Sequence, residues 1–222
     1  MISIIGGVPV NVPVDRKNFH PDMDAIRSSI TDRTRMIMVN SPCNPTGAVY
    51  TREEIEEIVS IAIEHDLWII SDEIYSRLIW NGGEHVSPAT IEGGKERTIV
   101  ISGWSKTWAM TGMRVGFLAG PEQAVRAAVK CQANSASHIP TFMMEAARVA
   151  LDCDDHVERF SDAYRHRRNL IVQGLEDIPG LRIVNPEGAF YLFIDVSGTG
   201  MSDVEFADGA LEAGVQLIPA SL

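Results

Sequence analysis

Short apolar runs alternate with amphipathic stretches over the first two thirds of the chain, and this alternation constrains its fold more than any other feature. Four apolar runs bounded by turn residues lie at positions 34–40, 67–70, 97–102 and 117–119. Such runs are typical of strands that are buried on both faces of a sheet. Between the first two runs, Thr51 and Glu54 form a capping-box pattern that predicts the start of a helix. We therefore predict an α/β fold, with a mostly parallel sheet and helices on both of its faces.

The last third of the chain has a different pattern. A long amphipathic stretch covers residues 141–175, with a predicted break near residues 152–155. Strands are predicted at 181–184, 189–195 and 215–218, a helix at 203–213, and two strand pieces within residues 2–14. We interpret residues 1–150 as a large domain and residues 151–222 as part of a smaller α+β domain.

Charge and cysteine content exclude several classes of function. Thirty acidic residues against nineteen basic ones give a formal net charge of −11. This balance repels phosphate backbones and anionic lipids, so neither nucleic acid nor a membrane is expected as a partner. The three cysteines, Cys43, Cys131 and Cys153, lack the spacing of metal ligands, and no metal site is predicted. They are expected to be reduced thiols of a cytoplasmic protein.

Polar residues follow three of the predicted strands. The three clusters are Asn44-Pro45-Thr46-Gly47, Ser71-Asp72-Glu73-Ile74-Tyr75, and Ser102-Gly103-Trp104-Ser105-Lys106 with Arg114 beyond it. Taken singly, each has an ordinary explanation: a turn, a helix cap at Asp72, or a surface amine at Lys106. Ligands of open α/β sheets bind at the carboxyl ends of strands, which is where all three clusters are predicted to lie. Together they would place an amide, a carboxylate, a phenol, an amine and a guanidinium along one edge of the sheet.

This set of groups suits one cofactor, pyridoxal 5′-phosphate. An amine forms a Schiff base with an aldehyde, and a carboxylate keeps a ring nitrogen protonated so that the ring accepts electrons. A hydroxyl and a guanidinium suit a phosphate group. The residues alone therefore predict a pyridoxal-phosphate site.

Four segments resemble those of a known family. Residues 41–47, 71–75 and 105–116 are similar to the three signatures of the class I/II aminotransferases, which are fold type I pyridoxal-phosphate enzymes. Asn185-Pro-Glu-Gly-Ala-Phe-Tyr191 resembles the start of the family's small-domain strand. The form Ala-Met-Thr-Gly-x-Arg is most similar to the branch that includes aspartate and aromatic aminotransferases. The resemblance implies transfer of an amino group from an amino acid to a 2-oxo acid, by a protein that is a homodimer at full length.

The resemblance also implies roles for individual residues. By motif, Lys106 would form the aldimine and move the proton, and Asp72 would pair with the pyridine nitrogen. Tyr75 and Asn44 would bind the ring oxygen. Arg114 and Ser105 would bind the phosphate. A cis peptide bond is implied before Pro45. Gly103 departs from members that carry a second phosphate-binding serine there, and Tyr191 is interpreted as small-domain core or hinge.

Two other functions stay open at this point. The same residues would serve a pyridoxal-phosphate-dependent carbon–sulfur lyase, and some transcription regulators carry an aminotransferase-like sensor domain. Family members also have residues before and after the region that matches this chain. The chain is therefore expected to be a fragment that lacks N- and C-terminal parts and is poorly active by itself.

Overall fold

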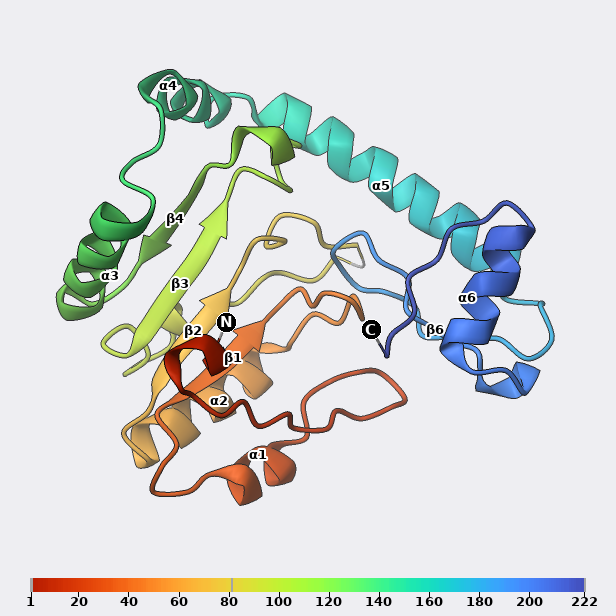
Figure 1. The fold of residues 1–222 in the computed structure, drawn as a ribbon, viewed down its shortest axis with the longest axis horizontal. Helices are drawn as coiled ribbons and strands as arrows, with labels where there is room; N and C mark the ends of the chain where they lie inside the picture. Colours follow the sequence, from red (N-terminus) through yellow and green to blue (C-terminus); the bar gives the residue numbers. More distant parts are fainter. Residues whose placement is uncertain (1, 81, 222) are drawn as a thin grey trace.

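A computed structural model describes residues 2–80 and 82–221 of the chain (Figure 1). Its helices are α1 (Met23–Ser29), α2 (Arg52–Glu64), α3 (Glu122–Ser135), α4 (Thr141–Ala150), α5 (Asp154–Leu175) and α6 (Asp203–Glu212). Its strands are β1 (Met36–Asn40), β2 (Trp68–Asp72), β3 (Thr98–Gly103), β4 (Gly116–Ala119), β5 (Arg182–Ile183) and β6 (Ile194–Asp195). Short 3-10 helices are η1 (Ile2–Ile5), η2 (Pro88–Thr90), η3 (Thr111–Met113) and η4 (Ser197–Thr199).

The larger sheet has the strand order β1-β2-β3-β4. Its first three strands are parallel, as predicted, whereas β4 pairs with β3 in the antiparallel direction. The register places Asn40 beside Asp72, and Asp72 beside Ile101. The carboxyl ends of the parallel strands therefore form one continuous edge, to which the polar clusters are attached.

Helix α2 builds the main core on one face of the sheet. Thr51 and Glu54 form the predicted capping box, in which each side chain accepts a hydrogen bond from the other residue's backbone N–H. The apolar face of α2 contacts Val39 and Ile69, and five of its residues are buried: Ile55, Ile58, Val59, Ile61 and Ala62. Each of the buried isoleucines and Val59 stabilises the fold by about 1.5–3 kcal/mol through the removal of apolar surface from water.

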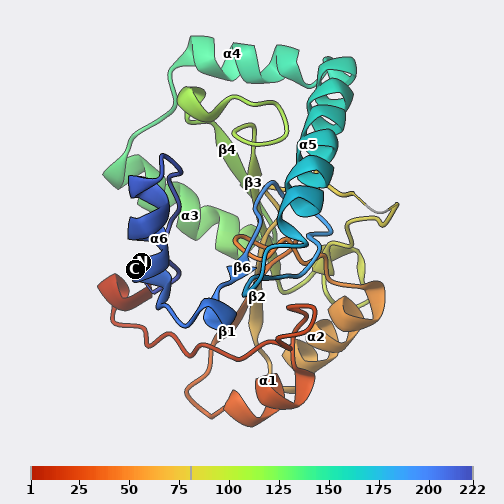
Figure 2. The same cartoon turned by 90° about the vertical axis from the view of Figure 1, so that its right-hand side faces the viewer.

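The opposite face of the sheet is largely open. Alternate residues of a strand point to opposite faces, so Met36 and Met38 point away from α2, and their exposed fractions are 43% and 59%. Ile101 and Leu118 share this face and are also exposed. Helix α3 lies on this side in Figure 2, across the sheet from α2, but none of its residues is buried. Helices therefore lie on both sides of the sheet, as predicted, while the second face keeps an apolar surface.

The last third of the chain forms a separate small sheet. Strands β5 and β6 pair in the antiparallel direction, and α6 follows them after a second capping box at Ser202 and Glu205. The predicted break in the long helical stretch is confirmed, because α4 ends at Ala150 and α5 begins at Asp154. Helix α5 runs along the molecule towards this small sheet (Figure 1).

Several predicted strands are wrong or shorter than expected. Residues 2–5 form η1, and 215–218 form no strand, with exposed fractions of 55% at Val215 and 88% at Ile218. The predicted strand at 189–195 is reduced to Ile194–Asp195. An apolar run forms a strand only where a neighbouring segment satisfies its backbone groups. Within the described residues, 2–5 and 215–218 pair with no strand, and the bond from Ala189 to Leu78 is not extended into a ladder over the residues that follow it.

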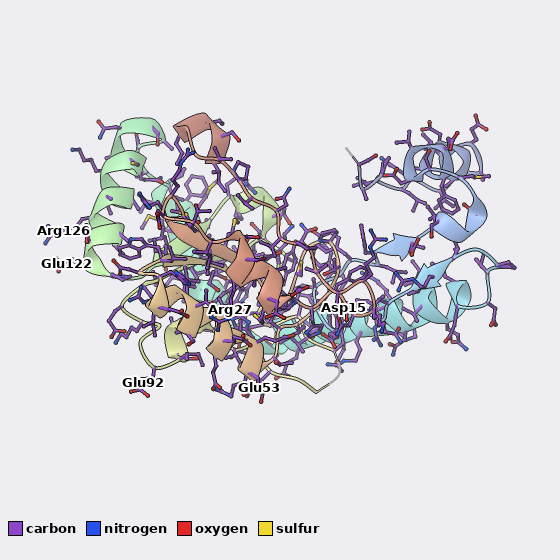
Figure 3. All side chains as sticks on the ribbon, turned by 90° about the horizontal axis from the view of Figure 1, so that it is seen from below. Asp15, Arg27, Glu53, Glu92, Glu122 and Arg126 are labelled. Atoms are coloured by element: carbon purple, nitrogen blue, oxygen red, sulfur yellow. The ribbon has the colours of Figure 1, made fainter. Side chains whose placement is uncertain are left out.

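Charged side chains line the outer helices, and Figure 3 labels Glu53 on α2 and Glu122 with Arg126 on α3. Arg27 of α1 instead forms ion pairs with Glu57 and Glu64 of α2. Glu122 and Arg126 form an ion pair four residues apart, a spacing that places both on the same helix face. Across the described part of the chain, no helix combines the length and apolar character needed to cross a membrane.

Candidate functional site

The first polar cluster is folded back onto the edge of the sheet. Asn40, the last residue of β1, donates from its side-chain amide to the carbonyl oxygen of Asp72 at 3.1 Å. Its side-chain oxygen accepts from the backbone N–H of Asn44 at 2.8 Å. One amide therefore links the Asn44 turn to the end of β2, and the peptide bond before Pro45 is cis, as the resemblance implied.

Asp72 is the last residue of β2, and its side chain does not cap an α-helix. Its Oδ1 accepts a hydrogen bond from the backbone N–H of Ile74 at 3.2 Å, and a turn follows instead of a helix. The helix-cap explanation of this carboxylate is therefore wrong. Asp72 is half-buried at the carboxyl edge of the sheet, so its carboxylate is available for a ligand at this edge.

Tyr75 lies in a buried aromatic cluster beside this edge. Its side chain has an exposed fraction of only 3%, and its hydroxyl lies 2.6 Å from the hydroxyl of Tyr191. Burial raises the pKa of Tyr75 well above its usual range, and the Tyr191 hydroxyl and the charge of Asp72 raise it further. The side-chain amide of Asn44 acts on this pKa in the opposite direction. The Tyr75 phenol is therefore neutral, and it can donate a proton in a hydrogen bond.

Lys106 points its amine towards the same cluster. Its Nζ lies 5.9 Å from the ring centroid of Tyr75 and 5.3 Å from that of Phe190, within the range of cation–π attraction. The residue is half-buried in the turn that follows β3. The structure thus brings an amine from one motif to a phenol from another.

Arg114 and Ser105 occupy the outer part of the same turn. Arg114 has a left-handed backbone, with φ of 54°, and its guanidinium donates to the carbonyl oxygen of Thr111 at 3.0 Å. The Thr111 hydroxyl donates in turn to the carbonyl oxygen of Ser105 at 3.2 Å. Thr111 therefore links the two predicted phosphate ligands, and Arg114 remains exposed at the surface.

Gly103 allows this turn to leave the sheet. A Cβ atom at Gly103 would lie 2.7 Å from the carbonyl oxygen of Val115 and 2.8 Å from the Cα of Gly116. Both of those atoms belong to backbone, which cannot move aside without separating β3 from β4. The serine that some family members carry at this position has no room here.

Glu73, for which no role was expected, anchors the turn that follows β2. Its buried carboxylate accepts from the hydroxyls of Ser71 at 2.9 Å and Ser87 at 2.5 Å, and it lies 3.0 Å from Nε2 of His85. Its backbone N–H donates to the carbonyl oxygen of Ile101 on β3 at 2.8 Å. Burial favours the neutral acid, but the neighbouring His85 imidazole and the hydrogen bonds from the Ser87 and Ser71 hydroxyls outweigh it and lower the pKa of Glu73.

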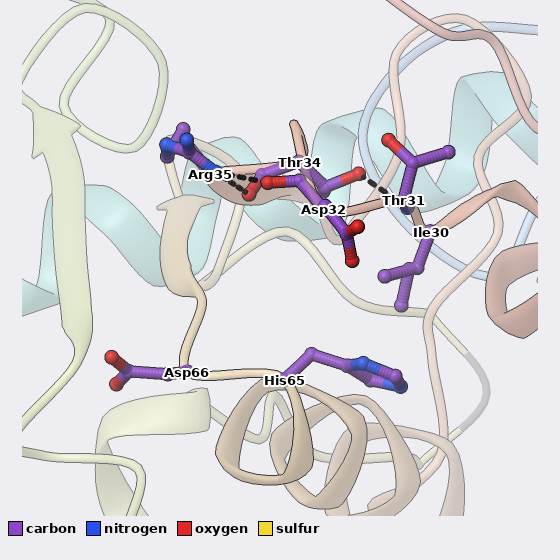
Figure 4. A pocket seen from close by; sticks show the side chains of 7 residues that line it. All are labelled: Ile30, Thr31, Asp32, Thr34, Arg35, His65 and Asp66. Atoms are coloured by element: carbon purple, nitrogen blue, oxygen red, sulfur yellow. Dashed lines mark hydrogen bonds between the residues drawn. The ribbon is translucent and has the colours of Figure 1, made fainter.

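An open pocket lies elsewhere, at the amino ends of β1 and β2 (Figure 4). Its polar side chains bond to their own loop: Arg35 donates to the carbonyl oxygens of Asp32 and Thr34. His65 and Asp66, at the end of α2, are exposed on its other side. Among residues 2–80 and 82–221, no three side chains are grouped as metal ligands.

Comparison with known proteins identifies the family. The sequence model described as "Aminotransferase class I and II" matches residues 1–222, the whole chain. The chain belongs to this family. Membership of this family accounts for the mostly parallel sheet and for the order of the motifs.

The most informative relatives are aspartate and aromatic aminotransferases. The aminotransferase chain is 42% identical to aromatic-amino-acid aminotransferase 2 of Thermococcus litoralis, over 99% of this chain and 58% of the relative. It is 40% identical to an aspartate aminotransferase of Pyrococcus abyssi, with the same two coverages. The structure of aspartate aminotransferase from Thermus thermophilus with maleate superimposes with a TM-score of 0.93 at 38% identity, over 99% of this chain and 58% of that one. The chain thus spans about 58% of the length of these relatives.

Membership of the aminotransferase family implies pyridoxal phosphate as the cofactor. The groups that the structure gathers fit it chemically: an amine at Lys106 for the aldehyde, a carboxylate at Asp72 for the ring nitrogen, and a phenol at Tyr75 for the ring oxygen. Tyr191, expected to be small-domain core or hinge, lies in this candidate site against Tyr75. The sequence signal for it was the Gly-Ala-Phe-Tyr motif, but nothing in the sequence revealed its partner.

Proposed function

We propose that this chain forms the cofactor-binding core of a pyridoxal-phosphate-dependent aminotransferase, which moves an amino group from an amino acid to a 2-oxo acid. One observation carries the proposal: the Lys106 amine lies 5.9 Å from the ring of Tyr75, beside the strand edge that ends at Asp72. A lysine, a phenol and a carboxylate from two different turns converge there. A solvated surface lysine would have no reason to point into an aromatic cluster.

Each site residue has a proposed role towards the cofactor. Lys106 would bond to the aldehyde carbon, and Asp72 would hold a proton on the ring nitrogen. Tyr75 and Asn44 would bind the ring oxygen. Ser105 and Arg114 would bind the phosphate, after Arg114 exchanges its bond with the Thr111 carbonyl for the anion.

The reaction would depend on moving a proton between the two carbon atoms that flank the substrate nitrogen. When bound, the cofactor supplies an electron-accepting ring that stabilises negative charge at the substrate α-carbon. The Lys106 amine, released by the substrate amine, would take the α-carbon proton and deliver it to the carbon on the other side of the substrate nitrogen, a 1,3-proton shift. Asp72 would keep the ring nitrogen protonated throughout, and the neutral phenol of Tyr75 would donate a hydrogen bond to the ring oxygen.

Further proposals concern the whole protein. We propose a homodimer at full length, and a division into domains at residues 1–150 and 151–222. The free thiols of Cys43, Cys131 and Cys153 support a reducing compartment, the cytoplasm. The 222-residue chain alone is expected to be weakly active, since it spans only about 58% of the length of its relatives.

The test is Lys106→Ala in the full-length protein, with the exposed Lys95→Ala as a matched control. The loaded wild type and the control should show a visible absorbance band and transfer amino groups to a 2-oxo acid. Lys106→Ala should lose both. Retained turnover in Lys106→Ala would refute the assignment, and release of pyruvate and ammonia without an acceptor would identify a lyase instead.

A further inference from the structure

The segment that carries Tyr191 is fixed between two of the site's loops. The carbonyl oxygen of Gly47 accepts from the backbone N–H groups of Glu187 at 2.9 Å and Gly188 at 2.8 Å. The next residue, Ala189, donates its N–H to the carbonyl oxygen of Leu78 at 2.8 Å. The segment therefore joins the loop of the first motif to the turn that follows the second.

Close approach of the backbone makes this junction tight. A Cβ atom at Gly47 would lie 2.4 Å from the Cβ of Pro186, so only glycine permits the contact. Ala189 is fully buried beneath Tyr75. The residues that follow, Phe190 and Tyr191, consequently enter the site from a fixed backbone.

Both aromatic rings then pack against Tyr75. The ring centroid of Tyr75 lies 5.4 Å from that of Phe190 and 5.7 Å from that of Tyr191, both in edge-to-face geometry. The hydroxyls of Tyr75 and Tyr191 lie 2.6 Å apart, a short distance for two neutral hydroxyls. This contact joins residues that are 116 positions apart in the sequence.

We propose that Tyr191 is a positioning residue, whose hydroxyl donates to the Tyr75 oxygen and so directs the Tyr75 proton towards the cofactor. This inference rests on the proposed function, in which Tyr75 binds the cofactor's ring oxygen. Each phenol has a single proton to donate. In the structure the Tyr191 hydroxyl raises the pKa of Tyr75, as an acceptor of the Tyr75 proton does. When Tyr75 instead gives its proton to the ring oxygen, Tyr191 becomes the donor between the two tyrosines. A hydroxyl that accepts one hydrogen bond becomes a stronger donor in the next, so Tyr191 strengthens the contact of Tyr75 with the ring.

The test compares Tyr191→Phe, Tyr75→Phe and the double variant in the full-length protein. Tyr164→Phe is the matched control, because Tyr164 stacks on Phe190 at 5.2 Å in the same aromatic cluster. Each variant loses only hydroxyl groups. The readout is the pH titration of the bound cofactor's absorbance, with kcat and KM measured in parallel and with unfolding of the cofactor-free protein by urea.

Tyr191→Phe should shift the titration midpoint in the same direction as Tyr75→Phe but by less, about 0.3 units. Tyr164→Phe should titrate like the wild type, and adding Tyr191→Phe to Tyr75→Phe should cause no further shift. A packing role alone would change the urea midpoint and leave the titration where it was. A wild-type titration in Tyr191→Phe, or a further shift in the double variant, would overturn the inference alone. Absence of Lys106-dependent absorbance in the wild type would instead overturn the proposed function, and this inference with it.

Discussion

Nε2 of His20 lies 3.1 Å from a carboxylate oxygen of Glu187, a residue 167 positions further along the chain. Nδ1 of the same ring lies 2.8 Å from both carboxylate oxygens of Glu54, at the start of α2. Glu187 also accepts from the backbone N–H of Val49 at 2.9 Å. One imidazole thus joins the amino-terminal segment, the helix that supports the sheet, and the segment that leads to Tyr191.

This bridge predicts a pH-dependent stability. The hydrogen bond to Glu54 raises the pKa of His20 above 6.5, against the opposing effect of burial, and the charges of Glu54 and Glu187 add to the rise. Because the folded-state pKa is the higher one, the stabilisation is complete below the unfolded value and is lost as the pH rises through the folded value. His20→Gln should therefore lower the free energy of unfolding by about 1–2 kcal/mol at about pH 5.5, and by less than half of that at about pH 9.

Urea unfolding at the two pH values measures this effect. The control is His65→Gln, because His65 is exposed at the end of α2. Equal losses at both pH values for His20→Gln would show that the ring acts through packing and not through its charge.

The buried carboxylate of Glu73 predicts a second effect on stability. The Glu73 carboxylate accepts hydrogen bonds from two serine hydroxyls and lies beside His85. Glu73→Gln removes its negative charge and puts N–H donors in place of one carboxylate oxygen. We expect a loss of about 2 kcal/mol near neutral pH. Since the folded-state pKa is lowered, this contribution is present above the ordinary glutamate value of 4.5 and is lost as the pH falls through the folded value.

Thermal unfolding across the acid range would measure the contribution of Glu73. The exposed Glu53→Gln on α2 serves as the control and should change stability by less than about 0.5 kcal/mol. If the two variants unfold alike at neutral pH, the network beneath the turn does not stabilise it.

Gly103 at the end of β3 and Gly112 in the turn that follows provide a matched pair. Gly103→Ala would place a methyl group 2.7 Å from the Val115 carbonyl oxygen, whereas a methyl group at Gly112 meets no atom within 4 Å. We expect Gly103→Ala to destabilise the protein by about 1–3 kcal/mol and Gly112→Ala to change it by less than about 0.5 kcal/mol. Guanidinium unfolding curves measure both. If Gly103→Ala leaves the free energy of unfolding unchanged, then β3 and β4 tolerate separation at this point.

The capping box of α2 predicts a smaller effect. Thr51→Ala removes the oxygen that accepts from the Glu54 N–H at 3.2 Å, so the first turn of the helix loses a partner. The expected loss is about 1 kcal/mol, seen as a lower urea midpoint with an unchanged slope. Ser28→Ala in α1 is the control, because its hydroxyl bonds to a carbonyl within its own helix. Equal effects from the two substitutions would argue against a capping role.

The parallel strands could be predicted because their apolar runs are bounded by turn residues and separated by a capped helix. The same signal failed at Val215–Ile218, because an apolar run does not specify a pairing partner. The alignment of Asn40, Asp72 and Ile101 follows from parallel pairing, so the edge that carries the motifs could also be predicted.

Contacts between distant segments could not be predicted. Tyr191 meets Tyr75 only because Gly47 and Leu78 bind the backbone before it, and no local pattern encodes those bonds. The Glu73 carboxylate likewise contacts Ser87 and His85, which lie more than ten residues further along the chain and outside the motif that contains Glu73. The sequence therefore indicated the chemistry of the site, while the residues that orient it emerged from the fold.

Met36, Met38 and Ile101 leave an apolar sheet face in contact with water. A surface of this kind favours self-association and capture by chaperones. When the 222-residue chain is produced alone, its yield in cells should follow chaperone capacity and culture temperature more than the integrity of Lys106 or Asp72. A mutational screen scored by expression level would therefore select polar replacements on β1 and β3 and would overlook the chemical groups.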